Sequence, residues 1–271
     1  MRSLKSRAKT AVARTLRARP DFLVIGAQKA GTTSLHSYLS QHEDLQPSDG
    51  PKELHYFDYH YDRAGLDWYL AHFPYRFRRT GELLFEATPD YMIHECVPAR
   101  IHRDLGVKKL IAVLREPVSR AFSAWRMWHH FAESKPHLAF KADTRNFAQA
   151  ISEELACKDM QNERHFHYVK GGHYADQIES YRHHFPDDQL LVLNYDDMKG
   201  DLAGFLDRIC DFLDVAPFDR ETVSDMGGQK LWVTPKVEMT EDMRATFETL
   251  RDYYTPHNER LFALLDSRWD W

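Results

Sequence analysis

A short apolar run that leads into a glycine-containing loop constrains the fold of this chain more than any other sequence feature. Residues 22–25 read Phe-Leu-Val-Ile, Gly26 and Gly31 bracket the loop, and residues 32–41 carry apolar side chains at helical spacing. Glycines let the backbone turn tightly and approach an anion, and the first N–H groups of a helix point toward that anion. The sequence therefore predicts a strand, an anion-binding loop and a helix, in that order.

Strands alternate with helices along the rest of the chain. Residues 82–86, 109–114 and 189–194 are further strand candidates, and the last two are nearly continuous apolar runs, as in strands buried on both faces of a parallel sheet. Helical spacing occurs at 97–104, 118–131, 146–157, 174–184, 200–213 and 240–265, the last with an expected interruption near 254–256. This alternation predicts an α/β fold with a central, mostly parallel sheet flanked by helices, as one domain over residues 21–271.

Composition and cysteine content narrow the class of protein. The 271 residues are 43% hydrophobic and 28% charged, as in ordinary globular proteins. The apolar runs are strand-sized, well short of the ~20 residues of a membrane helix, and the N-terminus lacks the apolar segment of a secretory signal. Cys96, Cys157 and Cys210 are too few and too far apart for a disulfide framework or a zinc site. These features predict a soluble protein of the cytoplasm without a transmembrane segment.

The net charge of −5 conceals a basic N-terminal extension. Residues 1–20 hold seven of the 36 Lys and Arg residues and none of the 41 Asp and Glu residues. The extension is expected to be solvated and partly helical; the alternative is a weak contact with an anionic membrane surface or a polyanionic partner. The acidic remainder of the chain argues against a nucleic-acid partner.

The glycine spacing of the loop matches that of nucleotide-binding P-loops, but its lysine does not. Thr32, and not a lysine, follows the second glycine, and Lys29 lies before that glycine. A nucleoside triphosphate with magnesium needs a lysine at the later position. An anion cradle is therefore favoured over a P-loop kinase, and a loop that merely turns a strand into a helix remains a third interpretation.

Residues 22–35, FLVIGAQKAGTTSL, resemble the 5′-phosphosulfate loop of sulfotransferases that use 3′-phosphoadenosine-5′-phosphosulfate (PAPS). The likeness is closest to the carbohydrate group, which includes the heparan and chondroitin sulfate enzymes. It implies a P-loop-like sulfotransferase fold, PAPS as donor, adenosine 3′,5′-bisphosphate as product and no metal. It also implies that Lys29 contacts the sulfate and its bridging oxygen. The loop residues implied to bind the donor are Gly26, Gln28, Lys29, Ala30, Gly31, Thr32, Thr33 and Ser34.

A second anion site is predicted at the end of the strand at 109–114. Arg115 follows this strand, and Pro117 is placed to begin a helix. A guanidinium there can hold a phosphate, or it can pair with Glu116 or a helix-capping carboxylate. The phrase LREPVSRAFSAW resembles the 3′-phosphate motif of the same family, which implies that Arg115 and Ser123 bind the 3′-phosphate.

The segment 51–58 contains the candidate base. A carboxylate or an imidazole can take the proton of an attacking hydroxyl, and in an extended segment Glu53 and His55 would point to the same side. KELHYFD resembles the segment of carbohydrate sulfotransferases in which this Glu is the general base. The resemblance therefore implies Glu53 as the base and His55 as a supporting or second candidate. Lys52 is either a cation near the acceptor or a surface lysine.

The chain departs from the heparan-type pattern at Ala87. Heparan-type relatives carry a lysine after the residue that matches Glu86, whereas the Glu-Ala form is similar to chondroitin-type and bacterial relatives. This departure puts a heparan-type acceptor in doubt, and it leaves a non-catalytic PAPS- or glycan-binding protein as an alternative. Glu86 itself is a candidate to orient Lys29 or to contact the acceptor.

Residues 227–236 match the family segment that closes over the adenine, with Lys230 and Trp232 as the implied contacts. Trp68, Trp125 and Trp128 are either sugar platforms or core residues. The predicted function is in-line transfer of the sulfuryl group from PAPS to a hydroxyl of an acceptor, with a carbohydrate implied. A polysaccharide, a glycolipid, a small alcohol and a carrier-bound hydroxyacyl chain all remain open as acceptors.

Overall fold

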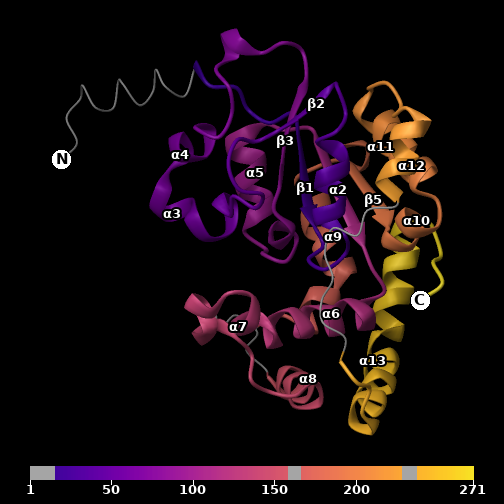
Figure 1. Cartoon of the computed structure of the whole chain (residues 1–271). Helices are drawn as coiled ribbons and strands as arrows, with labels where there is room; N and C mark the ends of the chain where they lie inside the picture. Colours follow the sequence, from indigo (N-terminus) through magenta and orange to yellow (C-terminus); the bar gives the residue numbers. More distant parts are fainter. Residues whose placement is uncertain (1–15, 158–165, 228–236) are drawn as a thin grey trace. The chain divides into compact units, whose positions relative to one another are not determined.

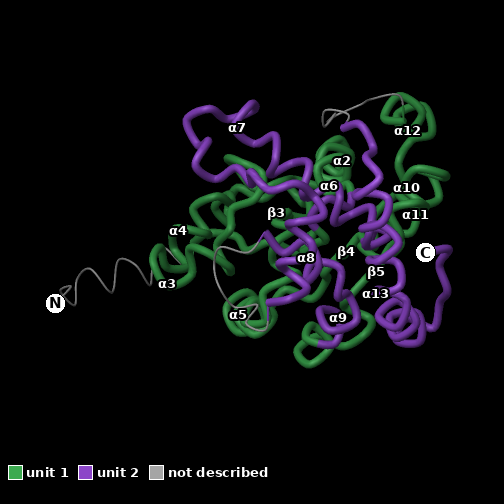
Figure 2. The backbone as a smooth tube through the Cα atoms, turned by 90° about the horizontal axis from the view of Figure 1, so that it is seen from below, with its two compact units in different colours: residues 1–27, 31–113, 180–229 green, residues 28–30, 114–179, 230–271 purple. Residues whose placement is uncertain are grey.

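The structure is a computed structural model that describes residues 16–157, 166–227 and 237–271. These residues form two compact units, shown in Figure 2. Unit 1 contains the described residues of the ranges 1–27, 31–113 and 180–229, and unit 2 those of 28–30, 114–179 and 230–271. The prediction of a single domain over residues 21–271 stays a prediction. Each unit is described by itself below.

Unit 1 is built on a five-stranded sheet with the order β2-β3-β1-β4-β5 (Figure 1). The strands are β1 (Phe22–Gly26), β2 (Leu45–Pro47), β3 (Leu83–Ala87), β4 (Lys109–Leu114) and β5 (Leu190–Asn194). The pairs β1–β3, β1–β4 and β2–β3 are all parallel. The predicted α/β class with a mostly parallel central sheet is therefore confirmed. The short strand β2 was not predicted.

Central strand β1 is buried along its whole length, which explains why its sequence is an unbroken apolar run. Phe22 is paired with Phe85 on β3 and with Lys109 on β4. Two residues further on, Val24 is paired with Ala87 and with Ile111. The carboxyl ends of these three parallel strands therefore lie at one edge of the sheet.

Helices cover both faces of this sheet. The chain leaves β1 through α2 toward β2, and it leaves β3 through α5 in the opposite direction, past β1 to β4. Because such crossovers are right-handed, α2 and α5 lie on opposite faces (Figure 1). The helices of unit 1 are α2 (Thr32–Leu39), α3 (Tyr61–Ala64), α4 (Leu66–Leu70), α5 (Val97–Leu105), α10 (Tyr195–Gly200), α11 (Leu202–Leu213) and α12 (Arg220–Gly227), with the short turns η1 (Tyr56–His60), η2 (Arg76–Arg78), η3 (Pro89–Met92) and η6 (Asp187–Gln189).

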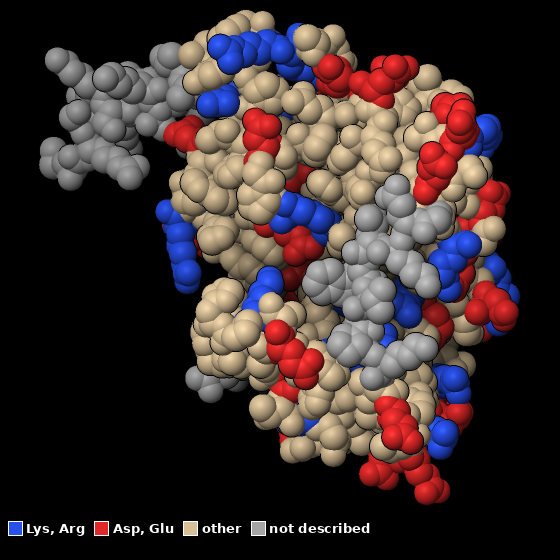
Figure 3. Space-filling view, viewed as in Figure 1, with Lys and Arg blue, Asp and Glu red and all other residues tan. Residues whose placement is uncertain are grey.

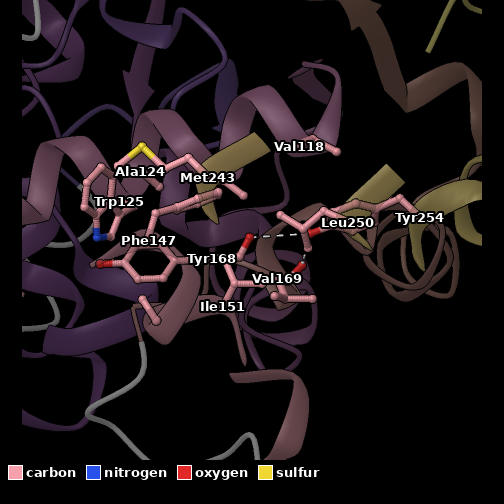
Figure 4. Packing of buried hydrophobic residues seen from close by; sticks show 12 residues of the cluster. Val118, Ala124, Trp125, Phe147, Ile151, Tyr168, Val169, Met243, Leu250 and Tyr254 are labelled. Atoms are coloured by element: carbon pink, nitrogen blue, oxygen red, sulfur yellow. Dashed lines mark hydrogen bonds between the residues drawn. The ribbon is translucent and has the colours of Figure 1, made fainter. Parts of the chain in front are cut away.

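Unit 2 is helical and packs around its own apolar cluster (Figure 4). Its elements are α6 (Pro117–His129), α7 (Phe131–Ser134), η4 (Pro136–Lys141), α8 (Phe147–Ala156), η5 (Lys170–Gly172), α13 (Glu241–Leu265) and most of α9 (Tyr174–Arg182). Phe147, Leu250 and Tyr254 are fully buried in the cluster, and the Tyr254 hydroxyl donates a 2.7 Å hydrogen bond to the Val169 carbonyl. Trp125 lies in this core and Trp128 packs against it, which supports the core interpretation for both.

Helix α13 runs through Pro256 without a break, so the expected interruption near 254–256 is wrong. A proline inside a helix removes one hydrogen bond and costs roughly 3 kcal/mol. The fully buried Tyr254 fixes the helix immediately before the proline, and Leu261 and Phe262 are buried one to two turns after it. Tertiary packing on both sides of Pro256 therefore outweighs the local cost.

The described part of the basic N-terminal segment is anchored to unit 1. Arg17 Nη1 donates to the Phe73 carbonyl at 2.7 Å, the Ala18 N–H donates to the Pro74 carbonyl at 2.9 Å, and Arg19 Nη1 donates to the Leu105 carbonyl at 3.0 Å. Ala18 is only 2% exposed. Residues 17–19 are thus packed, although they were assigned to a solvated extension, because their backbone and guanidinium groups satisfy carbonyls of unit 1.

Charged side chains of both signs are interspersed over much of the face shown in Figure 3. Within the described ranges, no helix combines the length and the apolar character needed to cross a bilayer.

Replacing Phe147 with alanine should destabilise the protein by about 3–5 kcal/mol, because it removes a fully buried ring from the core of unit 2 and leaves a cavity. The free energy of unfolding in urea measures this change. Phe140→Ala is the matched control, since Phe140 is 80% exposed and should cost less than about 0.5 kcal/mol. Equal losses for the two variants would contradict the described packing.

Candidate active site

The glycine loop joins β1 to α2 as the sequence predicts. Gly31 caps α2 with a φ of 81°, a conformation that favours glycine, and a Cβ there would lie 2.7 Å from Tyr195 Cε2 and overlap Met198. No side chain caps the start of α2 and its first turn contains no acidic residue, so nothing in these residues competes with an anion for its N–H groups. The start of α2 therefore fits an oxyanion such as a phosphate.

The loop residues differ in exposure and in the unit to which they belong. Gly26, Ala30 and Thr32 are buried, Thr33 is exposed, and Gln28, Lys29, Gly31 and Ser34 are partly exposed. Residues 28–30 belong to unit 2 and the others to unit 1. Thr33 and Ser34 thus retain solvent exposure on unit 1.

Unit 2 brings Lys29 and Arg115 together. Arg115 Nη1 donates to the Lys29 carbonyl at 3.2 Å, and the Arg115 carbonyl accepts a 2.8 Å hydrogen bond from the Tyr174 hydroxyl. Lys29 Nζ lies 3.6 Å from Met127 Sδ on α6. Glu116 is occupied elsewhere, because its carboxylate accepts hydrogen bonds from the N–H groups of residues 118 and 119 and so caps α6. The hydrogen bond from Arg115 to the Lys29 carbonyl fixes the loop backbone that carries the lysine.

Helix α6 adds a cation that sequence reasoning missed. Ser123, the predicted phosphate ligand, is 5% exposed on this helix, and Arg126 follows it by three residues. Burial and, second, the charge of Arg115 lower the pKa of Arg126. Two guanidinium groups that repel each other favour the binding of an anion beside them. We therefore add Arg126 to the candidate phosphate-binding residues. The signal available in the sequence was the three-residue spacing, which places Ser123 and Arg126 on one helix face.

In unit 1, four residues of the segment 51–58 form a chain of charged contacts. Lys52 Nζ lies 2.5 Å from Glu53 Oε1, His55 Nε2 lies 3.6 Å from Glu53 Oε2, and His55 Nδ1 lies 2.7 Å from Asp58 Oδ2. Asp58 was not assigned a role from the sequence, although it follows His55 by three residues. Glu53 is the most exposed of these four side chains, with 38% of its side chain accessible.

The expectation of an extended backbone at Glu53 and His55 is wrong, although the two side chains do meet. Both residues have left-handed φ values, 69° and 50°. The backbone is held there by hydrogen bonds to the end of β3, from Glu53 N–H to the Ala87 carbonyl at 3.1 Å and from His55 N–H to Thr88 Oγ1 at 3.4 Å. Strain of this kind persists only where the surroundings hold it, and it is common at functional sites.

These contacts set the protonation states of the pair. Burial acts to raise the pKa of Glu53, but the hydrogen bond from His55 and the charge of Lys52 outweigh it and lower the pKa to about 2. Burial acts to lower the pKa of His55, but the hydrogen bonds to Asp58 and Glu53 outweigh it and raise the pKa to about 10. At neutral pH a carboxylate therefore faces a protonated imidazole.

Two further titratable groups lie in this part of unit 1. Burial, followed by the charge of Lys52, lowers the pKa of His36 on α2 to about 4, so this imidazole is neutral. Burial raises the pKa of Glu86 to about 7, against the hydrogen bonds from Thr88 and Tyr69. Glu86 is 1% exposed and accepts from both hydroxyls. Its suggested contact with Lys29 or with the acceptor stays a prediction.

A group of potential metal ligands includes His55, the neighbour of the candidate base. The ligand atoms of His55, Asp58 and Asp90 lie within 4.8 Å of one another. A metal would have to displace the proton of His55, which is tightly held at a pKa of about 10. The prediction that no metal takes part stays a prediction.

Lys230 and Trp232, the implied adenine contacts, lie outside the described residues.

Comparison with known proteins identifies the family. The family model described as "Sulfotransferase domain" matches residues 19–229. The chain belongs to the sulfotransferase domain family. The resemblance on which the sequence predictions rest is therefore confirmed.

Relatives and solved structures agree with this family. The human bifunctional heparan sulfate N-deacetylase/N-sulfotransferase 3 is 32% identical to this chain, over 91% of this chain and 30% of its own length. The human bifunctional heparan sulfate N-deacetylase/N-sulfotransferase 2 is 31% identical, over 73% of this chain and 22% of its own length. This chain thus spans less than a third of the length of those two relatives. A sulfotransferase structure from Alicyclobacillus acidocaldarius has a TM-score of 0.71 at 27% identity and covers 93% of this chain and 98% of its own. A mouse sulfotransferase complexed with PAP shares the fold, with a TM-score of 0.51 at 18% identity over 94% of this chain and 86% of its own.

Replacing Asp58 with asparagine should lower the pKa of His55 from about 10 toward its ordinary value of 6.5, because the variant loses the carboxylate charge. A raised folded-state pKa contributes stability that is present below pH 6.5 and is lost as the pH rises through 10. The difference in unfolding free energy between the wild type and Asp58→Asn should therefore be largest below pH 6.5 and disappear above pH 10.

Titration of the His55 ring signals by NMR measures the pKa directly. Asp62→Asn is the control, since the Asp62 side chain is 82% exposed and lies 3.4 Å from Arg100 rather than beside His55. An unchanged His55 pKa in Asp58→Asn would contradict the described contact.

Proposed function

We propose that this sulfotransferase-family chain transfers the sulfuryl group of PAPS to a hydroxyl of a carbohydrate acceptor. The observation that carries the proposal is the Glu53 carboxylate, ionised, partly exposed and held between Lys52 and His55 in a left-handed backbone. In the proposed step the acceptor oxygen bonds to sulfur, the bond from sulfur to the phosphate oxygen breaks, and its electron pair leaves with adenosine 3′,5′-bisphosphate. Glu53 takes the acceptor proton.

The loop and α6 supply what the donor needs. PAPS, when bound, provides a sulfuryl group on a phosphate leaving group. The uncapped start of α2 with Thr33 and Ser34 would hold the 5′-phosphate, and Arg115 with Ser123 would hold the 3′-phosphate. Lys29 would neutralise the charge that grows on the bridging oxygen. A kinase is disfavoured because Thr32 stands where ATP with magnesium requires a lysine.

A carboxylate with a pKa of about 2 is a weak base, yet it suffices for this reaction. As the acceptor oxygen bonds to sulfur it becomes positively polarised, and its proton becomes far more acidic than that of a free hydroxyl. Proton transfer to Glu53 is then downhill late in the step. His55, protonated and bound to Asp58, positions Glu53 and keeps it ionised until that moment.

The relatives favour a second candidate acceptor, a sugar amine. Their names assign them N-sulfotransfer on heparan sulfate. An amine attacks sulfur only when it is unprotonated, whereas a hydroxyl is neutral at all relevant pH values. Ala87, where heparan-type relatives carry a lysine, argues against a heparan-type acceptor. The cytoplasmic location stays a prediction.

Glu53→Gln should lower kcat by about 10²–10⁴-fold, because an amide of the same shape cannot accept the proton. Transfer from labelled PAPS, with desulfated glycans and small alcohols screened as acceptors, measures the rate. Calorimetry should show the affinity for adenosine 3′,5′-bisphosphate unchanged within about twofold, since the donor contacts remain. Glu43→Gln, at an exposed position of unit 1, is the control and should retain full activity.

Arg115→Ala should show the converse pattern, with binding of adenosine 3′,5′-bisphosphate weakened at least about tenfold.

Full turnover in Glu53→Gln would remove the proposed base. Tight binding of ATP with magnesium and none of the bisphosphate would overturn PAPS as the donor.

An oligosaccharide with its amines acetylated should remain an acceptor at a rate similar to that of the same chain with free amines, because its hydroxyls are unchanged. Its rate should not rise with pH through the range where sugar amines lose their proton. Mass spectrometry of the product locates the sulfate. Transfer to the free-amine chain alone, with a rate that rises with pH, would establish the amine instead.

A further inference from the structure

A second cationic site lies in unit 1, at the edge of the sheet opposite the glycine loop. A cavity of about 610 Å³ is lined there by Phe22, Leu83 and Lys109, which are the first residues of β1, β3 and β4. The glycine loop leaves the other end of β1 at Gly26, and four residues of strand span roughly 13 Å. The cavity is therefore separate from the residues proposed to bind PAPS.

The charge of the cavity walls is strongly positive. Arg19, Arg76, Arg79, Lys108 and Lys109 line it, and Asp21 is its one acidic residue. The chain as a whole carries a net charge of −5. Like charges crowded around a partly enclosed space repel one another, and a bound anion relieves that repulsion.

The partners of these cations leave most of their charge uncompensated. Arg79 Nη2 lies 2.8 Å from Asp21 Oδ2, and among the described residues it is the one cavity cation with a carboxylate within 4.0 Å. Arg19 and Arg76 donate to backbone carbonyls, at 3.0 Å to residue 105 and 3.3 Å to residue 17, which fixes the guanidinium groups without cancelling their charge. The arginines are thus held in place around the cavity, as in a preformed anion site.

The remaining walls are apolar and the size is that of a small-molecule site. Phe22 is fully buried, and Ala18, Leu105, Val107 and Leu213 are each at most 6% exposed, so the floor of the cavity is part of the packed core. Sites for small ligands commonly measure about 300–1,000 Å³ and combine such a floor with a few charged groups. The space exceeds what a single inorganic anion needs.

We propose that this cavity binds a compact molecule that carries two or more sulfate or phosphate groups. A sulfated sugar unit and a phosphorylated metabolite share this chemistry. The site is independent of the proposed transfer reaction, because none of its residues belongs to the loop, α6 or the segment 51–58.

Calorimetry on the full chain, with adenosine 3′,5′-bisphosphate saturating the donor site, tests the proposal. The probes are a disulfated disaccharide, its unsulfated parent and inorganic pyrophosphate. One of the two anionic probes should bind, the unsulfated parent should not, and affinity should fall as salt is raised. Binding of the disaccharide alone identifies sulfated sugars, and binding of pyrophosphate alone identifies phosphates.

Arg76→Ala combined with Lys108→Ala should weaken binding at least about tenfold, because both side chains are exposed cavity cations whose loss leaves the core intact. The matched control combines Arg63→Ala with Lys141→Ala, two exposed residues outside the cavity, and should bind as the wild type does. Equal binding by the two double variants, or no binding of either anion, would overturn the proposal. Sulfuryl transfer measured in parallel is expected to proceed in both variants, so failure here is distinguishable from failure of the proposed function.

Discussion

The parallel pairing of β1 with β3 and β4 is the constraint on which the arrangement of unit 1 depends. Because Val24 is paired with both Ala87 and Ile111, the three strands end at one edge. The glycine loop starts at that edge from Gly26, and the backbone of Glu53 is hydrogen-bonded there to the Ala87 carbonyl. A single register therefore fixes both the beginning of the anion-binding loop and the candidate base. Ligand sites at the carboxyl ends of parallel strands are the general rule for such sheets.

The charges of the candidate site are held by neighbours rather than by solvent. Glu53 is ionised because His55 and Lys52 face it, and His55 is protonated because Asp58 and Glu53 face it. Each group thus depends on the next, so removal of one changes the protonation of the others. In unit 2 a neighbour also holds a candidate residue, since the Arg115 guanidinium donates a hydrogen bond to the carbonyl of Lys29. Preorganisation of this kind lets a small number of side chains stabilise developing charge.

Periodicity and glycine spacing were sufficient to predict the main strands, the loop and the helix after it. The apolar run at 22–25 predicted a strand, and the loop sequence restricted what could follow. The strand at 45–47 was missed because three residues carry no periodic signal. The continuity of α13 through Pro256 was missed because it depends on the burial of Tyr254, Leu261 and Phe262, which local sequence does not reveal.

The candidate site was predicted less completely than the fold. Glu53, His55, Lys29 and Arg115 were found through motifs, but the left-handed backbone at Glu53 and His55 was not. That conformation is imposed by hydrogen bonds to Ala87 and Thr88, more than 30 residues away along the chain. Roles for Asp58 and Arg126 emerged only from contacts across a turn and along a helix face. Local patterns thus point to candidate reacting groups, whereas the groups that contact them are defined by tertiary contacts.

The burial of Ala87 has a consequence for which residues this position of the chain can accept. Its side chain is 1% exposed, and its carbonyl anchors the backbone of Glu53. A lysine there would have to carry its charge out of a buried strand end without disturbing that anchor, and an unpaired buried charge is costly. Exchange between the Glu-Ala and Glu-Lys forms therefore requires accompanying changes in the surrounding core. A single Ala87→Lys substitution in this chain is therefore limited by folding stability, whatever acceptor the protein uses.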